Sequence, residues 1–167
     1  MFEIFMIIAG AGMRLLPHEP NFAPIAAIAL FGGVYLNKKY ALVLPLAAML
    51  ISDFFLGFHS TMVYVYGAFV LTGFLGFWLR KHKHVGTVFG SAVVSAVLFF
   101  LVTNFGVWAQ GMYARDLSGL MQSYLMGLPF FKNTLLSNLF YTGVMFGSYE
   151  LVKTLIAKKV FATTKAK

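Results

Sequence analysis

The chain has 167 residues, of which 60% are hydrophobic and only 11% charged, whereas a soluble globular domain carries roughly 25% charged residues. With a mean hydropathy of +0.82, this composition excludes a disordered chain, disfavours a soluble enzyme and predicts an all-α, polytopic membrane protein. The absence of cysteine excludes disulfides and thiolate metal sites. The net charge of +8 is explained by topology, because positive residues gather in cytoplasmic loops. We therefore expect a lipid bilayer, and no nucleic acid, as the surroundings of this chain.

Six apolar stretches predict six transmembrane helices, over residues 2–16, 22–36, 41–57, 63–79, 86–108 and 134–152. A helix needs about 20 residues to cross about 30 Å of hydrocarbon. The shorter stretches therefore require flexible ends or a locally thinner bilayer. We expect residues 1–157 to form a single integral membrane domain and residues 158–167 to form a basic cytoplasmic tail.

The first stretch contains Glu3 and ends near Arg14, so it is the least regular of the six. Residues 9–11 (Ala-Gly-Ala) resemble a signal-peptide cleavage site. However, the chain carries Glu3 where a signal peptide carries Lys or Arg. We interpret the stretch as a membrane helix, and a native start further upstream stays an open alternative.

Short connections separate the first five stretches. Residues 16–21 hold two prolines, which do not continue a helix, and residues 80–84 are basic. The only long connection, 109–133, contains an apolar segment over 118–131 that permits two interpretations. As a seventh span, this segment would place the lysine-rich tail outside. We predict instead a short extra helix in the outer loop 109–133.

The positive residues support this topology. With the amino terminus inside, the outer side holds only three of the 13 Lys and Arg residues, namely Arg14, Arg115 and Lys132, and the other ten are inside. The positive-inside rule thus predicts a multi-pass protein of the bacterial cytoplasmic membrane with both termini cytoplasmic.

Polar side chains within the apolar stretches are candidates for a ligand site, because they are costly in hydrocarbon. Asp53, Asn104 and Asn138 each lie about four residues, or about 6 Å, from the outer end of their stretch. They can therefore form one polar layer near the outer face. Arg14 ends the first stretch on the same side and is the expected ion-pair partner of Asp53. Such a pair either fixes the helix positions or lines a ligand site.

One face of the last stretch repeats at helical spacing through Thr134, Asn138, Tyr141, Thr142 and Met145. These residues either join packed helices by hydrogen bonds or line a pocket. Aromatic residues crowd the outer loops, where they form an interfacial belt or a stacking wall for a flat ligand. For stacking we favour Trp108 and Tyr124.

His82 and His84 lie in the basic inner loop, whereas His18 and His59 lie in two outer loops. Two histidines without nearby carboxylate ligands give a weak metal signal, and we predict no metal and no cofactor. The sequence contains no catalytic motif, so we predict no enzyme. The predicted substrate-binding set is Arg14, His18, Asn21, Asp53, His59, Asn104, Trp108, Tyr124, Asn133, Asn138 and Tyr141.

Small residues spaced four apart let helix backbones approach closely. In the second stretch these are Ala23 with Ala27, and Ala29 with Gly33. They either pack within the bundle or form a docking surface for another membrane subunit.

Four longer motifs carry a resemblance to a known family. They are Arg14-Leu-Leu-Pro-His-Glu-Pro-Asn-Phe-Ala-Pro-Ile (14–25) with Ala29-Leu-Phe-Gly-Gly (29–33), the segment 44–59 ending Ser52-Asp53-Phe-Phe-Leu-Gly-Phe-His, Val102-Thr-Asn-Phe-Gly-Val-Trp (102–108) and Leu128-Pro-Phe-Phe-Lys-Asn-Thr-Leu (128–135). The chain resembles, over about residues 14–150, an uncharacterised family of small bacterial membrane proteins assigned to transport. That family is similar in turn to the S components of energy-coupling factor (ECF) transporters.

The resemblance implies a six-helix, S-component-like bundle that captures a vitamin or similar micronutrient from outside. Such a subunit works against a transmembrane scaffold driven by two ATPases. It would dock through Ala23, Ala27, Ala29 and Gly33. Two alternatives stay open: a non-transporting accessory subunit of a larger membrane complex, and a stand-alone porter with a relay of Arg14, Asp53 and His59.

Overall fold

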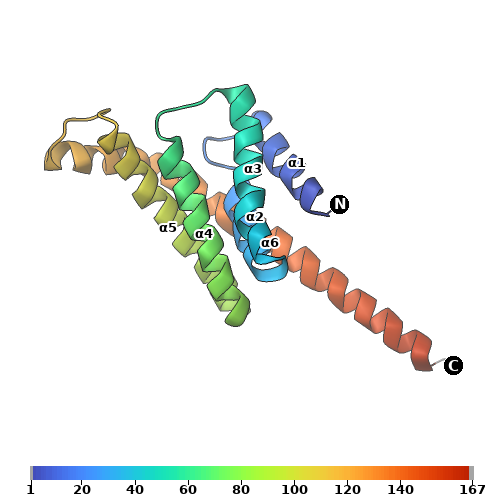
Figure 1. The fold of residues 1–167 in the computed structure, drawn as a ribbon. Helices are drawn as coiled ribbons and strands as arrows, with labels where there is room; N and C mark the ends of the chain where they lie inside the picture. The colour runs from blue at the N-terminus through green and yellow to red at the C-terminus, as the bar shows by residue number, and fades with distance from the viewer. Residues whose placement is uncertain (1, 166–167) are drawn as a thin grey trace.

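The computed structural model describes the backbone of residues 2–165 and the side chains of residues 4–158. Over this range it contains six helices and no strand (Figure 1), which confirms the all-α prediction there. The helices are α1 (Phe2–Leu15), α2 (Ile25–Tyr35), α3 (Lys38–Leu56), α4 (Met62–Lys81), α5 (Val85–Ala109) and α6 (Leu117–Lys165).

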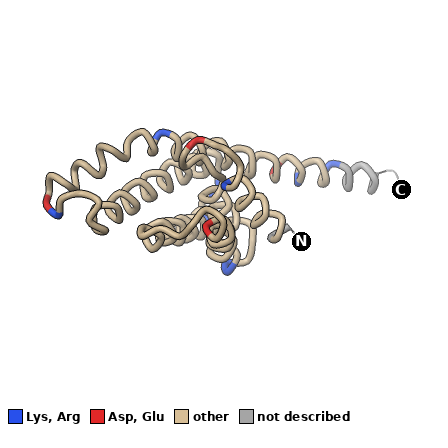
Figure 2. Tube along the Cα trace, turned by 90° about the horizontal axis from the view of Figure 1, so that it is seen from above, with Lys and Arg blue, Asp and Glu red and all other residues tan. Residues whose placement is uncertain are grey.

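Three of these helices, α3, α4 and α5, are long and apolar enough to cross a membrane. The described parts of α1 and α2 are apolar but shorter. Charged residues are sparse along the trace, with long uncharged stretches between them (Figure 2). The molecule is therefore consistent with a multi-pass membrane protein, while six separate spans remain a prediction.

The segment after α5 differs from the prediction of a short helix separate from the last span. Residues 117–165 form one continuous helix of 49 residues. The side chain of Asp116 accepts a hydrogen bond from the Gly119 amide (2.7 Å), which caps the first turn. Pro129 lies inside the helix and removes one backbone hydrogen bond without ending it. The predicted basic tail, 158–167, likewise begins within α6.

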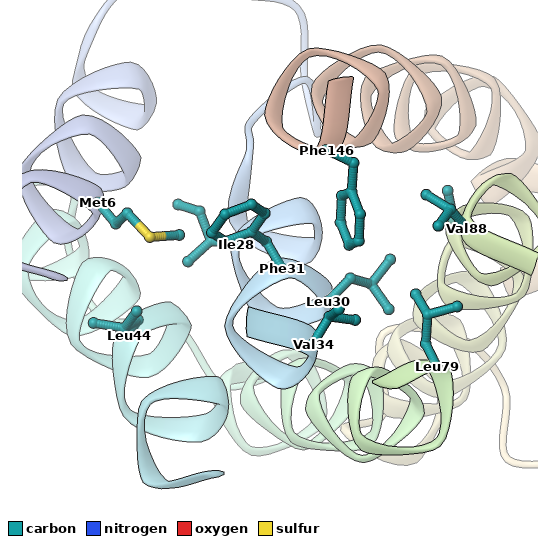
Figure 3. Packing of buried hydrophobic residues seen from close by; sticks show 10 residues of the cluster. Met6, Ile28, Leu30, Phe31, Val34, Leu44, Leu79, Val88 and Phe146 are labelled. Atoms are coloured by element: carbon teal, nitrogen blue, oxygen red, sulfur yellow. The ribbon is translucent and has the colours of Figure 1, made fainter. Parts of the chain in front are cut away.

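Helix α2 forms the centre of the bundle, and every residue from Ile25 to Val34 is buried. A helix that is apolar on all sides is stable only when other elements surround it. Figure 3 shows Ile28, Leu30 and Phe31 of α2 meeting side chains from the surrounding helices, among them Phe146 of α6.

The small residues of α2 lie inside this core. A Cβ atom on Gly33 would come within 2.6 Å of the Cα atom of Gly76 on α4, and Ala27 and Ala29 are 1% and 0% exposed. Ala23 is partly buried beside the core. Ala27, Ala29 and Gly33 thus pack within the bundle, and their role in docking a partner subunit stays a prediction.

At the end of the bundle predicted to be cytoplasmic, three side chains join α2, α6 and the α4–α5 loop. The Tyr35 hydroxyl donates a hydrogen bond to Glu150 Oε1 (2.6 Å). Lys83 forms an ion pair with Glu150 and lies 4.8 Å from the centre of the Tyr35 ring. Beyond this cluster, α6 projects away from the other helices (Figure 1).

Candidate functional site

A cavity of about 480 Å³ lies at the end of the bundle where α1, α3 and α5 end and where α2 and α4 begin. Residues from all six helices line it, together with residues of the loops 16–24 and 57–61. By the positive-inside rule, this end is the predicted outer end.

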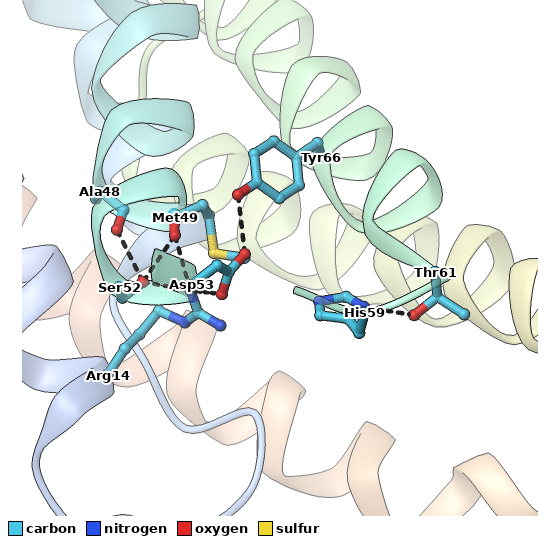
Figure 4. A network of polar contacts seen from close by, with 8 residues as sticks. All are labelled: Arg14, Ala48, Met49, Ser52, Asp53, His59, Thr61 and Tyr66. Carbon is cyan, nitrogen blue, oxygen red and sulfur yellow. Dashed lines mark hydrogen bonds and ion pairs between the residues drawn. The ribbon is translucent and has the colours of Figure 1, made fainter. Parts of the chain in front are cut away.

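The best-defined polar contact at the cavity is the ion pair between Arg14, which lines it, and Asp53, which lies behind Arg14. Arg14 Nη1 lies 2.7 Å from Asp53 Oδ1, and the Tyr66 hydroxyl donates to Asp53 Oδ2 (2.8 Å), as Figure 4 shows. Arg14 also donates to Ser52 Oγ. The predicted pairing of Arg14 with Asp53 is thus confirmed.

Local structure places this pair. The Ser52 hydroxyl donates back to the Ala48 carbonyl (2.8 Å), which leaves its oxygen free to accept from Arg14. Helix α3 ends at Leu56, within one turn of Asp53, because Gly57 takes a φ of 99° that other residues rarely adopt. Asp53 is only 1% exposed and does not line the cavity; it lies behind Arg14 and holds it in place.

Two loops form the rim. His18 accompanies Asn21, whose φ of 63° is a left-handed conformation that asparagine tolerates. The Nδ1 atom of His18 lies 2.7 Å from the Leu16 carbonyl oxygen. In the second loop, His59 Nδ1 lies 2.9 Å from Thr61 Oγ1. The structure therefore brings His18, Asn21 and His59 to the same cavity as Arg14.

The opposite wall comes from α5 and α6. Asn104 donates to the Phe100 carbonyl (2.8 Å), and a Cβ atom on Gly127 would meet Asn104 Oδ1 at 2.3 Å. Deeper in the bundle, a 2.9 Å hydrogen bond joins the Asn138 amide group and the Ser95 hydroxyl. Asn104 and Asn138 thus line the cavity as members of the predicted set.

Besides Asp53, four predicted site residues do not line the cavity: Trp108, Tyr124, Asn133 and Tyr141. They make contacts within the protein. Trp108 Nε1 donates to the Ala114 carbonyl (3.0 Å), and the Tyr124 hydroxyl donates to the Leu101 carbonyl (3.0 Å).

Asn133 donates to the Pro20 carbonyl (3.1 Å) and so ties α6 to the first rim loop. Tyr141 packs against Phe22 of the same loop, with ring centres 5.7 Å apart. The side chains of these two residues, and those of Trp108 and Tyr124, thus contact loops and helices around the cavity. Their predicted role in substrate binding stays a prediction.

Sequence reasoning missed most of the apolar wall, which includes Val65, Phe69 and Phe99. Nothing distinguishes these residues from core residues in an apolar stretch. One signal was available on α6: Ser123, Gly127, Phe130, Thr134 and Asn138 recur every three or four residues and all line the cavity. That stripe is visible only when residues 118–131 and 134–152 are treated as one helix.

Among the described residues, no group of three or more His, Asp or Glu side chains is placed to hold a metal ion. The polar groups of the cavity are suited instead to hydrogen bonding and to holding one charge. Such an arrangement, with few polar groups on an apolar wall, is typical of sites for small organic molecules.

No curated protein and no solved structure matches this chain. A family model matches residues 1–160, and the chain belongs to that family, DUF6580, which is described as a family of unknown function. Its function is therefore argued from the site itself.

Proposed function

We propose that this member of the DUF6580 family is the substrate-binding subunit of an uptake system in a bacterial cytoplasmic membrane. It holds a vitamin or similar small micronutrient in the cavity at its outer end. The observation that carries this proposal is the cavity itself, with its volume of about 480 Å³ and walls from all six helices. Sites for small molecules have volumes of about 300–1,000 Å³ and mostly apolar walls.

The charge distribution supports an outward-facing cavity. At the opposite end of the bundle lie five positive residues: Lys38 and Lys39 at the start of α3, Arg80 and Lys81 at the end of α4, and Lys83 in the α4–α5 loop. Positive loops stay on the cytoplasmic side, so the cavity end faces outside. A subunit with this orientation binds its ligand from outside, before the energy-consuming step of uptake.

The chain contains no nucleotide-binding motif. Energy for uptake would therefore come from a partner, and a transmembrane scaffold with two ATPases fits the resemblance to S components. The projecting part of α6 offers a surface for such a partner, because Leu151, Val152, Leu155 and Ile156 are all more than half exposed.

The same surface favours a second candidate function, a non-transporting accessory subunit of a larger membrane complex. In that case the partner on α6 would matter and the cavity would stay without a ligand. The two functions therefore differ in whether the purified protein carries a small molecule.

A cavity-filling variant tests the proposal. Val65 lines the cavity, whereas Val63, on the same helix, is 79% exposed and serves as the matched control. We expect native mass spectrometry of gently purified protein to show a bound small molecule in the wild type and in Val63→Trp, and none in Val65→Trp.

A wild-type protein that carries no small molecule would contradict the proposal, as would equal occupancy in Val65→Trp. Recovery of a ligand-free chain with unrelated membrane subunits in stoichiometric amounts would favour the accessory function.

A further inference from the structure

We propose that the cavity selects a small molecule that carries an anionic group, most simply a carboxylate, and that Arg14 binds this group. The inference rests on the proposed function and specifies the class of its substrate. It follows from the charges of the cavity wall, from the free donors of Arg14 and from the aromatic wall beside it.

The charged and titratable side chains that line the cavity favour an anionic ligand. The residues that line the cavity include the cation Arg14 and the histidines His18 and His59, but no aspartate or glutamate. Asp53 lies close by, yet it is only 1% exposed. Its Oδ1 accepts from Arg14 and its Oδ2 from Tyr66. A ligand in the cavity thus meets the guanidinium and does not meet the carboxylate.

Arg14 retains unused donors. Its Nη1 atom makes the bonds to Asp53, Ser52 and the Met49 carbonyl, and its Nε and Nη2 atoms donate to no acceptor in the described part of the chain. Figure 4 shows a guanidinium nitrogen outside the network of dashed lines. The arginine fork matches the two oxygens of a carboxylate, and Arg14 lines the cavity with 17% of its side chain exposed.

The ion pair with Asp53 preorganises the Arg14 guanidinium for binding an anion. A guanidinium in an apolar bundle is costly unless it is paired, and the ion pair with Asp53 keeps Arg14 charged and fixed in position before a ligand arrives. Helix α2 adds further donors, because it begins at Ile25 without a side-chain cap and Ile25 and Ala26 line the cavity. The positive end of a helix favours an anion.

The rest of the wall defines the body of the ligand. Phe69 and Phe99 lie side by side with ring centres 5.2 Å apart, and Val65 and Phe130 extend the same apolar surface. Asn138 supplies an amide at the deep end. The cavity therefore fits a carboxylate on an apolar or aromatic body.

The test uses two probes of one shape, 1-naphthoate and its uncharged amide 1-naphthamide, titrated calorimetrically into the full-length protein in detergent. Because a hydrogen bond to a charged group contributes about 1.5–3 kcal/mol, we expect the wild type to bind the carboxylate at least about tenfold more tightly. Arg14→Gln combined with Asp53→Asn removes both charges together and leaves no unpaired ion. This double variant should lose the preference.

Lys132→Gln is the matched control, because it removes another predicted outer cation that does not line the cavity, and it should keep the preference. Equal binding of both probes by the wild type, or an unchanged preference in the double variant, would overturn the anion assignment. The proposed function would survive that result, because the Val65→Trp comparison tests it separately. If neither probe binds, the molecule released from the wild type decides: an acid supports the inference, and a neutral or cationic molecule overturns it.

Discussion

Asp53 is the residue on which the cavity end of the bundle most depends. It is buried, and its two oxygens hold Arg14 of α1 and Tyr66 of α4, so that one side chain of α3 connects three helices. The sequence predicted the pair with Arg14, because two opposite charges near one membrane face have few other partners. It could not predict Tyr66, whose hydroxyl reaches Asp53 only through the packing of α3 against α4.

We predict that Asp53→Ala destabilises the protein by about 3–5 kcal/mol, because it leaves the Arg14 guanidinium partly buried and unpaired. Tyr66→Phe removes one hydrogen bond and should cost less, about 1.5–3 kcal/mol. Unfolding in detergent by titration with denaturant measures both. The interpretation fails if Asp53→Ala is no less stable than Tyr66→Phe.

At the scale of the helices, the close crossing of α2 and α4 is set by glycine. A Cβ atom on Gly33 would clash with the backbone of Gly76, and backbone atoms cannot move aside as a side chain can. The small-residue spacing in the sequence predicted close packing of this helix, but it did not identify the helix against which these residues pack. Only the structure shows that α4 is the partner.

We expect Gly33→Ala to destabilise the protein by about 1–3 kcal/mol, the usual cost of overpacking. Gly67→Ala is the control on α4, because no atom lies within 4 Å of its added Cβ and alanine favours a helix. Thermal unfolding of the two variants should therefore move in opposite directions or, for Gly67→Ala, not at all. Equal losses in both would refute the assignment.

The cluster at the other end makes a pH-dependent contribution. The hydrogen bond from Lys83 to Glu150 raises the pKa of Lys83. A raised folded-state pKa stabilises the protein below the unfolded-state pKa, and this stabilisation is lost as the pH rises through the folded value. Because both side chains are partly exposed, the contribution stays below about 1 kcal/mol.

The predicted difference in stability between the wild type and Lys83→Met is accordingly constant from about pH 7 to pH 9 and shrinks only above the ordinary lysine range. Unfolding curves at several pH values measure it. A difference that disappears already near neutral pH would show that Lys83 does not contribute through its charge.

Helix α6 marks the limit of element prediction. The sequence predicted a short helix within residues 118–131 that was separate from the span beginning at residue 134. The Asp116 cap starts the helix earlier, and packing of α6 against α5 carries it through the proline. When residues 118–131 and 134–152 are treated as two helices, the stripe of cavity residues from Ser123 to Asn138 is divided between them. Its helical periodicity is then not visible in the sequence.

For the whole molecule, composition was sufficient to predict a helical membrane protein, since few charged residues can be accommodated in a bilayer. It was not sufficient to predict the cavity. An empty space depends on how six helices pack, and its wall residues Phe69 and Phe99 have the same character as residues of the filled core.

The absence of cysteine makes the orientation directly measurable. We predict that Ser60→Cys, in the exposed loop between α3 and α4, reacts with a membrane-impermeant maleimide in intact cells. Lys81→Cys, at the opposite end of α4, should react only after the membrane is opened. The reverse pattern would place the cavity on the cytoplasmic side and would contradict the uptake proposal.

The length of α6 has a mechanical consequence. At about 1.5 Å per residue, 49 residues extend for about 74 Å, more than twice the thickness of the hydrocarbon. One part of this rod touches the cavity through Thr134 and Asn138, and the helix runs on to Lys165 without another proline. A small tilt of α6 at the cavity would therefore move its far end over a larger distance. In the proposed function, a ligand in the cavity and a partner at the far end would act on the same helix.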